Sequence, residues 1–240
     1  MKIIELENIS YSYTDVSVLN NVSLKVNKRE NLVILGGSGA GKSTILKIIL
    51  GLLKPDLGSV RIFGQDITHS KEREIHPIRH RMGMVFQGGA LFDSLTVWEN
   101  VGYCMMENHN APLEQIHRNV NEKLAFVELQ HAFEYLPSEL SGGMRKRVAI
   151  ARAVVCDPEI VLFDEPTAGL DPIASKVING LIVKLRDEKR VSSVVVTHIL
   201  KDAFAVADRV AMLKNGEIIF EGAIEELHRS KDPYIKEFVH

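Results

Sequence analysis

Residues 36 to 43 read Gly36-Gly37-Ser38-Gly39-Ala40-Gly41-Lys42-Ser43, and Thr44 follows them. This is the pattern of a phosphate-binding P-loop, whose glycines let backbone N–H groups turn towards a phosphate chain without Cβ clashes. An apolar run from Leu32 to Leu35 precedes the loop and predicts a buried strand, and residues Lys42 to about Leu52 predict a helix. A strand before the loop and a helix after it are the context that the motif requires.

The loop predicts a site for a nucleoside triphosphate. Lys42 would lie along the β- and γ-phosphates, and the Ser43 hydroxyl would bind Mg²⁺. The N-terminus of the following helix would add partial positive charge. A Gly-rich turn that arose by chance would not account for the flanking strand and helix. The residues expected to contact the nucleotide are Gly36, Gly37, Ser38, Gly39, Ala40, Gly41, Lys42, Ser43 and Thr44.

Two carboxylates follow a second apolar run, Ile160 to Phe163. In a parallel sheet, chemistry collects at the carboxyl ends of the strands. Asp164 is therefore placed to hold Mg²⁺, directly or through water, and Glu165 to polarise the attacking water as a general base. A solvated acidic loop is the alternative, but such a loop does not need four apolar residues leading into it.

Polar residues follow two further predicted strands. His198 comes after Val194 to Val196 and Thr197, and Gln87 comes after Met84 to Phe86. His198 could hydrogen-bond the γ-phosphate and hold the water and Glu165, although a lone histidine is more often structural. The Gln87 amide could reach Mg²⁺ or the water, which is a weak signal by itself.

A second anion site is predicted at Leu140-Ser141-Gly142-Gly143-Met144. A serine N-cap followed by two glycines presents free N–H groups and a hydroxyl at the start of a helix. Because the chain already has one phosphate loop, a head-to-tail pair explains the second site, with each turn closing over the nucleotide of the other chain. Without the P-loop, an ordinary capped helix would be the preferred interpretation.

The pattern of the whole chain predicts one compact α/β unit. Of the 240 residues, 45% are hydrophobic and 25% are charged. Strands and helices alternate, which implies a parallel sheet covered on both faces. From about Gly88 to Cys156 the strand signals vanish and helical patterns replace them. Near the end, Asn215-Gly216 between two apolar runs predicts a hairpin.

Composition excludes several classes of protein. The formal net charge of -2 argues against a general nucleic-acid binder. Met1 to Ile9 lacks the features of a secretion signal, and the densest apolar run, Ile45 to Leu53, is too short to cross a bilayer. Cys104 and Cys156 have no Cys/His cluster around them, so both are expected to be small core residues in a reducing compartment.

The order of these motifs resembles the nucleotide-binding subunits of ATP-binding cassette (ABC) transporters, over essentially the whole chain. The resemblance implies a P-loop NTPase (RecA-like) core at 1–87 and 157–240, with an N-terminal antiparallel β subdomain and an inserted helical subdomain at 88–156. It implies a peripheral ATPase at the cytoplasmic face of the inner membrane, with ATP and Mg²⁺ as cofactors and no nucleic-acid partner.

The resemblance also implies roles for single residues. Tyr13 resembles the aromatic residue that stacks on adenine, Gly36 to Thr44 the Walker A loop, and Ala168 to Asp171 the D-loop. Expected catalytic residues are Glu165, His198 and Gln87. Expected metal ligands are Ser43, Gln87 and Asp164. The signature residues that act on the partner's nucleotide are expected to be Ser141, Gly142 and Gly143. Met144 and Gly169 depart from the usual pattern, and neither change removes a group that touches phosphate or metal.

Within that family, the segments Phe86 to Val97, Pro137 to Met144 and Asp232 to Phe238 are similar to the Mla-type ATPases of MCE-associated phospholipid transport. This resemblance implies a lipid cargo, a separate permease dimer and possible association with an MCE-type lipid-binding protein. Apolar residues after Gln87 would line a groove for a helix of the permease or form the small core of the insertion. They are Leu91, Phe92, Leu95, Val97 and Trp98.

Three rival functions remain open from the sequence. Importers of small solutes such as amino acids share all the catalytic motifs. A soluble ABC ATPase that acts on DNA or ribosomes would usually carry two cassettes or a long coiled-coil insertion, and this chain has neither. A nucleotide-gated interaction module would bind ATP without turnover, and Glu165→Gln distinguishes such a module from a hydrolase.

Overall fold

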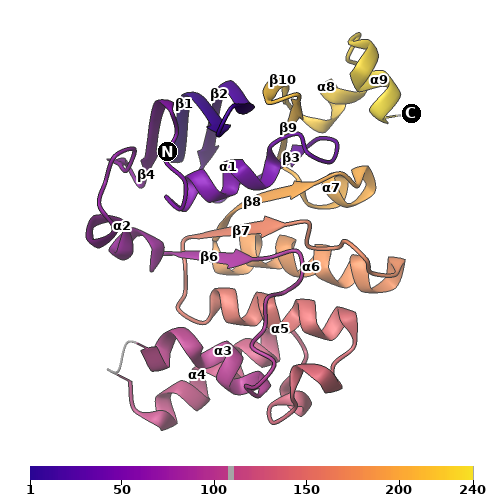
Figure 1. Cartoon of the computed structure of the whole chain (residues 1–240). Coiled ribbons are helices and arrows are strands. Elements are labelled where there is room, and N and C mark those ends of the chain that lie inside the picture. Colours follow the sequence, from indigo (N-terminus) through magenta and orange to yellow (C-terminus); the bar gives the residue numbers. More distant parts are fainter. Residues whose placement is uncertain (108–110, 240) are drawn as a thin grey trace.

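The computed structural model describes residues 1–107 and 111–239 and contains two sheets (Figure 1). The larger sheet has six strands in the order β10-β9-β3-β8-β7-β6 within the described residues. Its strands from β9 to β6 run parallel, and β10 is antiparallel to β9. The strand bounds are β3 Asn31–Leu35, β6 Met82–Val85, β7 Ile160–Asp164, β8 Ser192–Thr197, β9 Arg209–Lys214 and β10 Glu217–Gly222.

The smaller sheet is antiparallel, in the order β2-β1-β4-β5. Its strands are β1 Lys2–Tyr13, β2 Val16–Asn27, β4 Leu57–Ile62 and β5 Gln65–Asp66. Helix α1, Lys42–Ile49, packs between the two sheets, and its buried Ile45 and Leu46 share one apolar cluster with Leu6 of β1 and Leu162 of β7. The predicted α/β class with an N-terminal antiparallel sheet is confirmed.

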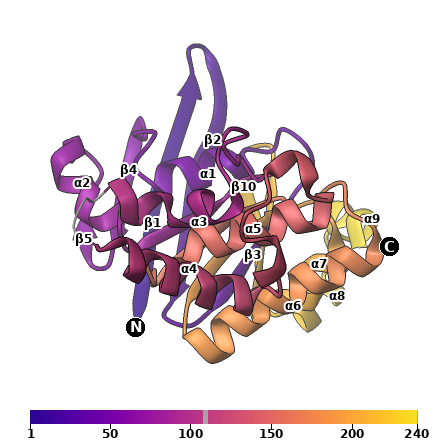
Figure 2. The same ribbon diagram turned by 90° about the horizontal axis from the view of Figure 1, so that it is seen from below.

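Helices cover the opposite face of the larger sheet (Figure 2). Helix α5, Gly142–Val154, packs against β6 and against α3, α4 and α6, so it joins the helical part to the sheet. The other helices are α2 Glu72–Arg79, α3 Val97–Glu107, α4 Leu113–Phe126, η1 Gln130–Ala132, η2 Pro137–Glu139, α6 Pro172–Lys189, α7 Leu200–Val206, α8 Ile224–His228 and α9 Pro233–Val239.

Among the described residues between 88 and 156 there is no strand, as the pattern predicts, while the division into subdomains stays a prediction. The hairpin at Asn215-Gly216 is present, and both residues have positive φ, at 50° and 80°. No helix within residues 1–107 and 111–239 is long and apolar enough to span a bilayer.

The expectation that both cysteines are buried core residues is wrong. Cys156 is exposed in the turn that follows α5, and it forms a disulfide with Cys104 of α3. The two residues are 52 positions apart in the chain, and the packing of α3 against α5 brings them together. Spacing alone could not indicate a pair that depends on this helix packing.

Candidate nucleotide site

The loop between β3 and α1 depends on two glycines for steric reasons. A Cβ on Gly36 would lie 2.4 Å from the carbonyl oxygen of Leu213, and a Cβ on Gly41 would lie 2.7 Å from Leu19 Cδ2. Gly41 also has a φ of 104°, which L side chains rarely adopt. The loop can therefore lie this close to β9 and β2 only because these positions carry no side chain.

Lys42 is buried at the first position of α1 and points back over the loop. Its Nζ donates hydrogen bonds to the carbonyl oxygens of Gly36, at 2.8 Å, and Gly37, at 2.9 Å. The same Nζ lies 3.4 Å from Oε1 of Glu165, so the two residues form an ion pair. Lys42 is 7% exposed and Glu165 8%, and little water can screen the pair.

Glu165 stands directly after β7 with an unusual backbone. Its φ is 46°, a left-handed conformation that costs free energy for a residue with a Cβ and that clusters at functional sites. Its N–H donates to the carbonyl oxygen of Val196 on β8, at 2.9 Å. Its Oε2 lies 3.0 Å from Nδ1 of His198, whose side chain is half exposed. The ends of β7 and β8 thus bring together the predicted base and the predicted histidine.

Oxygen ligands converge beside the loop. The Ser43 hydroxyl donates to Oδ1 of Asp164 at 3.0 Å. Burial raises the pKa of the Asp164 carboxyl above its usual value, and the hydrogen bond from Ser43 partly opposes this shift. Hydroxyl, carboxylate and amide oxygens are the ligands that Mg²⁺ prefers.

A cavity of about 650 Å³ gathers most of the predicted residues. Gly37 to Thr44 line it together with Gln87, Glu165 and His198. The sequence analysis missed two further lining residues, Val18 of β2 and Phe238 of α9. No motif marks them, because they reach the cavity through the fold of the first hairpin and of the last helix. Tyr13 is not among the lining residues; it is 42% exposed at the end of β1, with its ring against Tyr11.

The signature turn lies in a different place. Ser141, Gly142 and Gly143 line a separate cavity of about 700 Å³, together with Gly169 and Asp171. Among residues 1–107 and 111–239, none lines both this cavity and the one at the P-loop. Ser141 is the N-cap of α5 and accepts a hydrogen bond from Met144 N at 3.3 Å, as the sequence predicts.

A P-loop after β3, an acid pair at the end of β7 and a histidine directly after β8, the strand between them, define a P-loop nucleotide hydrolase. A family model described as ABC transporter matches residues 19–168. MlaF of Haemophilus influenzae, an intermembrane phospholipid transport system ATP-binding protein, is 39% identical over 99% of this chain and 90% of its own length. The probable ribonucleotide transport ATP-binding protein mkl of Mycobacterium bovis is 37% identical over 98% of this chain and 66% of its own length.

Solved structures agree with this assignment. The dimeric post-hydrolysis state of the ATP-binding cassette MJ0796, bound to ADP and Pi, superimposes with a TM-score of 0.85 and 35% identity. The match covers 92% of this chain and 99% of that chain. The chain therefore belongs to the ABC transporter family and is an ATP-binding, ATP-hydrolysing subunit, which confirms the resemblance drawn from its motifs.

Proposed function

We propose that this chain hydrolyses ATP to drive phospholipid transport at the cell envelope, through a separate permease dimer. The observation that carries this proposal is its 39% identity to MlaF, by name the ATP-binding protein of an intermembrane phospholipid transport system, across 99% of the chain. The cargo does not touch this chain, so its cavities carry no information about the transported molecule. The similarity to MlaF is what favours a lipid.

In the proposed mechanism, each group around the cavity has its own role. Backbone N–H groups of the P-loop and the Lys42 ammonium bind the phosphates. Glu165 accepts the proton of the attacking water, a role worth about 10²- to 10⁴-fold in rate. His198 holds the Glu165 carboxylate, with which it is already in contact at 3.0 Å. Gln87, which lines the same cavity, orients the water.

Mg²⁺ fits the residues present. Ser43, Asp164 and Gln87 supply hydroxyl, carboxylate and amide oxygens, and the first two already lie 3.0 Å apart. The ion would neutralise charge on the phosphate oxygens. Burial of Asp164 favours its protonated form, and a cation at this place would restore the carboxylate.

The two separate cavities support the proposed head-to-tail dimer. The signature turn cannot serve the nucleotide of its own chain while it lines a separate cavity, but it is open to a second copy. The MJ0796 cassette, a relative at 35% identity, is dimeric in its solved structure, which supports a dimer of this chain. Two equivalent contacts related by a twofold axis close the dimer.

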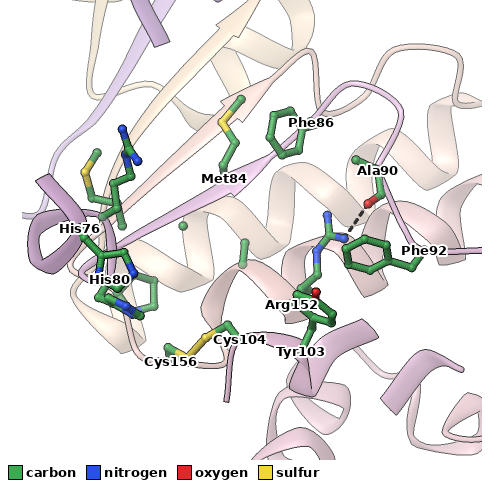
Figure 3. Close-up of a pocket in the computed structure, with 15 residues that line it drawn as sticks. His76, His80, Met84, Phe86, Ala90, Phe92, Tyr103, Cys104, Arg152 and Cys156 are labelled. Carbon is green, nitrogen blue, oxygen red and sulfur yellow. Dashed lines mark hydrogen bonds between the residues drawn. A yellow bond between two sulfur atoms is a disulfide. The ribbon is translucent and has the colours of Figure 1, made fainter. Parts of the chain in front are cut away.

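We propose that a permease helix binds in a third cavity, of about 460 Å³, between the sheet and the helical part (Figure 3). Phe86, Phe92 and Tyr103 line it, with Arg79 and Arg152 among their neighbours. Of the apolar residues named for this groove from the sequence, Phe92 lines the cavity, whereas Val97 is fully buried and Leu91 and Trp98 pack against the core. Docking there would place the chain peripherally at the cytoplasmic face of the inner membrane, and an MCE-type lipid-binding protein could join the same complex.

The test is purification of the tagged full chain from its native membranes, with mass spectrometry of the co-purifying protein and lipid. We expect a polytopic membrane protein at two copies per two ATPase chains, bound phospholipid, and ATPase activity that rises in phospholipid proteoliposomes. Stimulation by a soluble binding protein loaded with a small polar solute, without bound phospholipid, would overturn the lipid cargo. The ribonucleotide transport name of mkl makes nucleotides the first such solutes to try.

A further inference from the structure

Lys146 of α5 is a buried cation without a carboxylate partner. It is 6% exposed, and no Asp or Glu within the described ranges forms an ion pair with it. Its Nζ instead donates to two backbone carbonyl oxygens, that of Gln87 and that of Glu165, the latter at 3.4 Å. Burying a charged ammonium is costly unless it is paired, so a residue kept in this state calls for an explanation.

The two carbonyls belong to the two segments that flank the nucleotide cavity. Gln87 follows β6, and Glu165 follows β7. Both residues line the cavity, whereas Lys146 is not among its lining residues and donates to their backbone carbonyls. Burial lowers the pKa of Lys146, and the nearby carboxylates of Asp164 and Glu165 oppose this shift. Its ammonium therefore joins the signature helix to the backbone of the predicted water-orienting residue and of the predicted base.

A second cation of α5, Arg152, also donates to backbone carbonyls, and its contacts can be compared with those of Lys146. The Arg152 guanidinium donates to the carbonyl oxygens of Gly89, at 2.7 Å, and Ala90, at 2.6 Å. The segment from Gln87 to Ala90 is thus held against α5 at two points. Of these two cations, only Lys146 also contacts the catalytic strand end.

We propose that Lys146 is a positioning residue, which makes the backbone of Gln87 and Glu165 follow the helix that starts at Ser141. This inference rests on the proposed roles of Gln87 and Glu165. When the signature turn engages the nucleotide of the other chain, α5 moves as a unit from its N-terminus, and the ammonium at its second turn carries the movement to both carbonyls. The contact couples closure of the dimer to the geometry of the attacking water.

The test compares Lys146→Met, which has no donor, with Lys146→Gln, which keeps an N–H donor without the charge. The matched control is Lys123→Met, because Lys123 is 5% exposed in the same helical part and is paired with Asp157 and Glu122, away from the nucleotide cavity. We expect Lys146→Met to lower kcat for ATP at least ~10-fold with KM changed less than about 3-fold. Lys146→Gln should retain more activity, and Lys123→Met should keep the wild-type kcat even if its melting temperature falls.

Hydrogen exchange gives a second readout. Amides in the segment from Gln87 to Ala90 should exchange faster in Lys146→Met and at the wild-type rate in Lys123→Met. If Lys146→Met does not fold, the kcat and exchange of Lys146→Gln carry the test. Wild-type kcat in both Lys146 variants, or a raised KM with kcat unchanged, would overturn the inference and leave the ATPase function intact. A wild-type chain without ATPase activity would instead overturn the proposed function itself.

Discussion

Lys42 and Glu165 form a buried ion pair, with Nζ of Lys42 3.4 Å from Oε1 of Glu165. The pair joins the residue that we expect to bind phosphate with the residue that we expect to activate water. A triphosphate in the loop would offer Lys42 stronger anionic partners than one carboxylate. Glu165 would then exchange its contact with Lys42 for one with water. The geometry thus links the binding of phosphate to the release of the Glu165 carboxylate from its ion pair with Lys42.

Lys42→Met should therefore affect both nucleotide binding and stability. We expect ATP affinity to fall at least ~10-fold, because a charge-assisted contact to phosphate is lost. The free energy of unfolding should fall by about 1–3 kcal/mol, because Glu165 stays buried without its cation. Isothermal titration calorimetry and urea unfolding measure the two effects. Lys47→Met, on the exposed face of the same helix, is the control and should change neither.

The raised pKa of the Asp164 carboxyl predicts that the stability of the metal-free protein depends on pH. Burial raises its folded-state pKa above the unfolded value, so folding favours the protonated form. This contribution is fully present below the unfolded pKa and is lost as the pH rises through the folded pKa. Asp164→Asn should therefore unfold with a larger free energy than wild type at pH 7, and the difference should shrink towards pH 4. Equal stability of the two proteins at every pH would contradict this explanation.

Asp202 of α7 joins the segment after Glu165 to α6. Its carboxylate is buried and accepts hydrogen bonds from Thr167 Oγ1 and Asn179 Nδ2, both at 2.7 Å. Asp202→Ala should lower the free energy of unfolding by about 2–4 kcal/mol, since two donors lose a charged acceptor. Asp202→Asn should cost less. Chemical denaturation gives both values, and a loss below 0.5 kcal/mol in the alanine variant would show that the network contributes little to stability.

The disulfide between Cys104 and Cys156 predicts the thiol content of the protein. Under denaturing conditions without reductant we expect no free thiols, and two after reduction. Cys156→Ser should lower the free energy of unfolding by up to ~4 kcal/mol relative to the oxidised wild type, because the bond closes a long loop. Two free thiols before reduction would contradict the bond.

The sequence predicted the fold well wherever a local pattern was sufficient. The strand, loop and helix around Lys42, the acids after β7 and the hairpin at Asn215 all depend on neighbours in the chain. Boundaries were less accurate. The predicted strand before Gln87 ends at Val85, and α1 ends at Ile49 rather than near Leu52. Gly51 follows with a φ of 65°, and an α-helix cannot continue through a residue in this left-handed conformation.

Features that depend on long-range packing could not be predicted. Val18 and Phe238 line the nucleotide cavity from the two ends of the chain, and Cys104 meets Cys156 through the packing of two helices. Lys146 looked like one of several basic residues on a helix, and only the fold places its ammonium beside the carbonyl of Glu165. The role of Tyr13 came from the resemblance alone, and the structure gives its ring no place in the cavity lining.

The central claim is that each nucleotide is held between the Lys42 loop of one chain and the Ser141 turn of another. Light scattering of the Glu165→Gln variant with ATP and Mg²⁺ tests it most directly, with phosphate release measured in parallel. We expect turnover to fall about 10²- to 10⁴-fold and the mass to double, and the added variant Ser141→Arg should return the mass to that of one chain. Unchanged turnover, or a dimer that persists with Arg at position 141, would contradict the account.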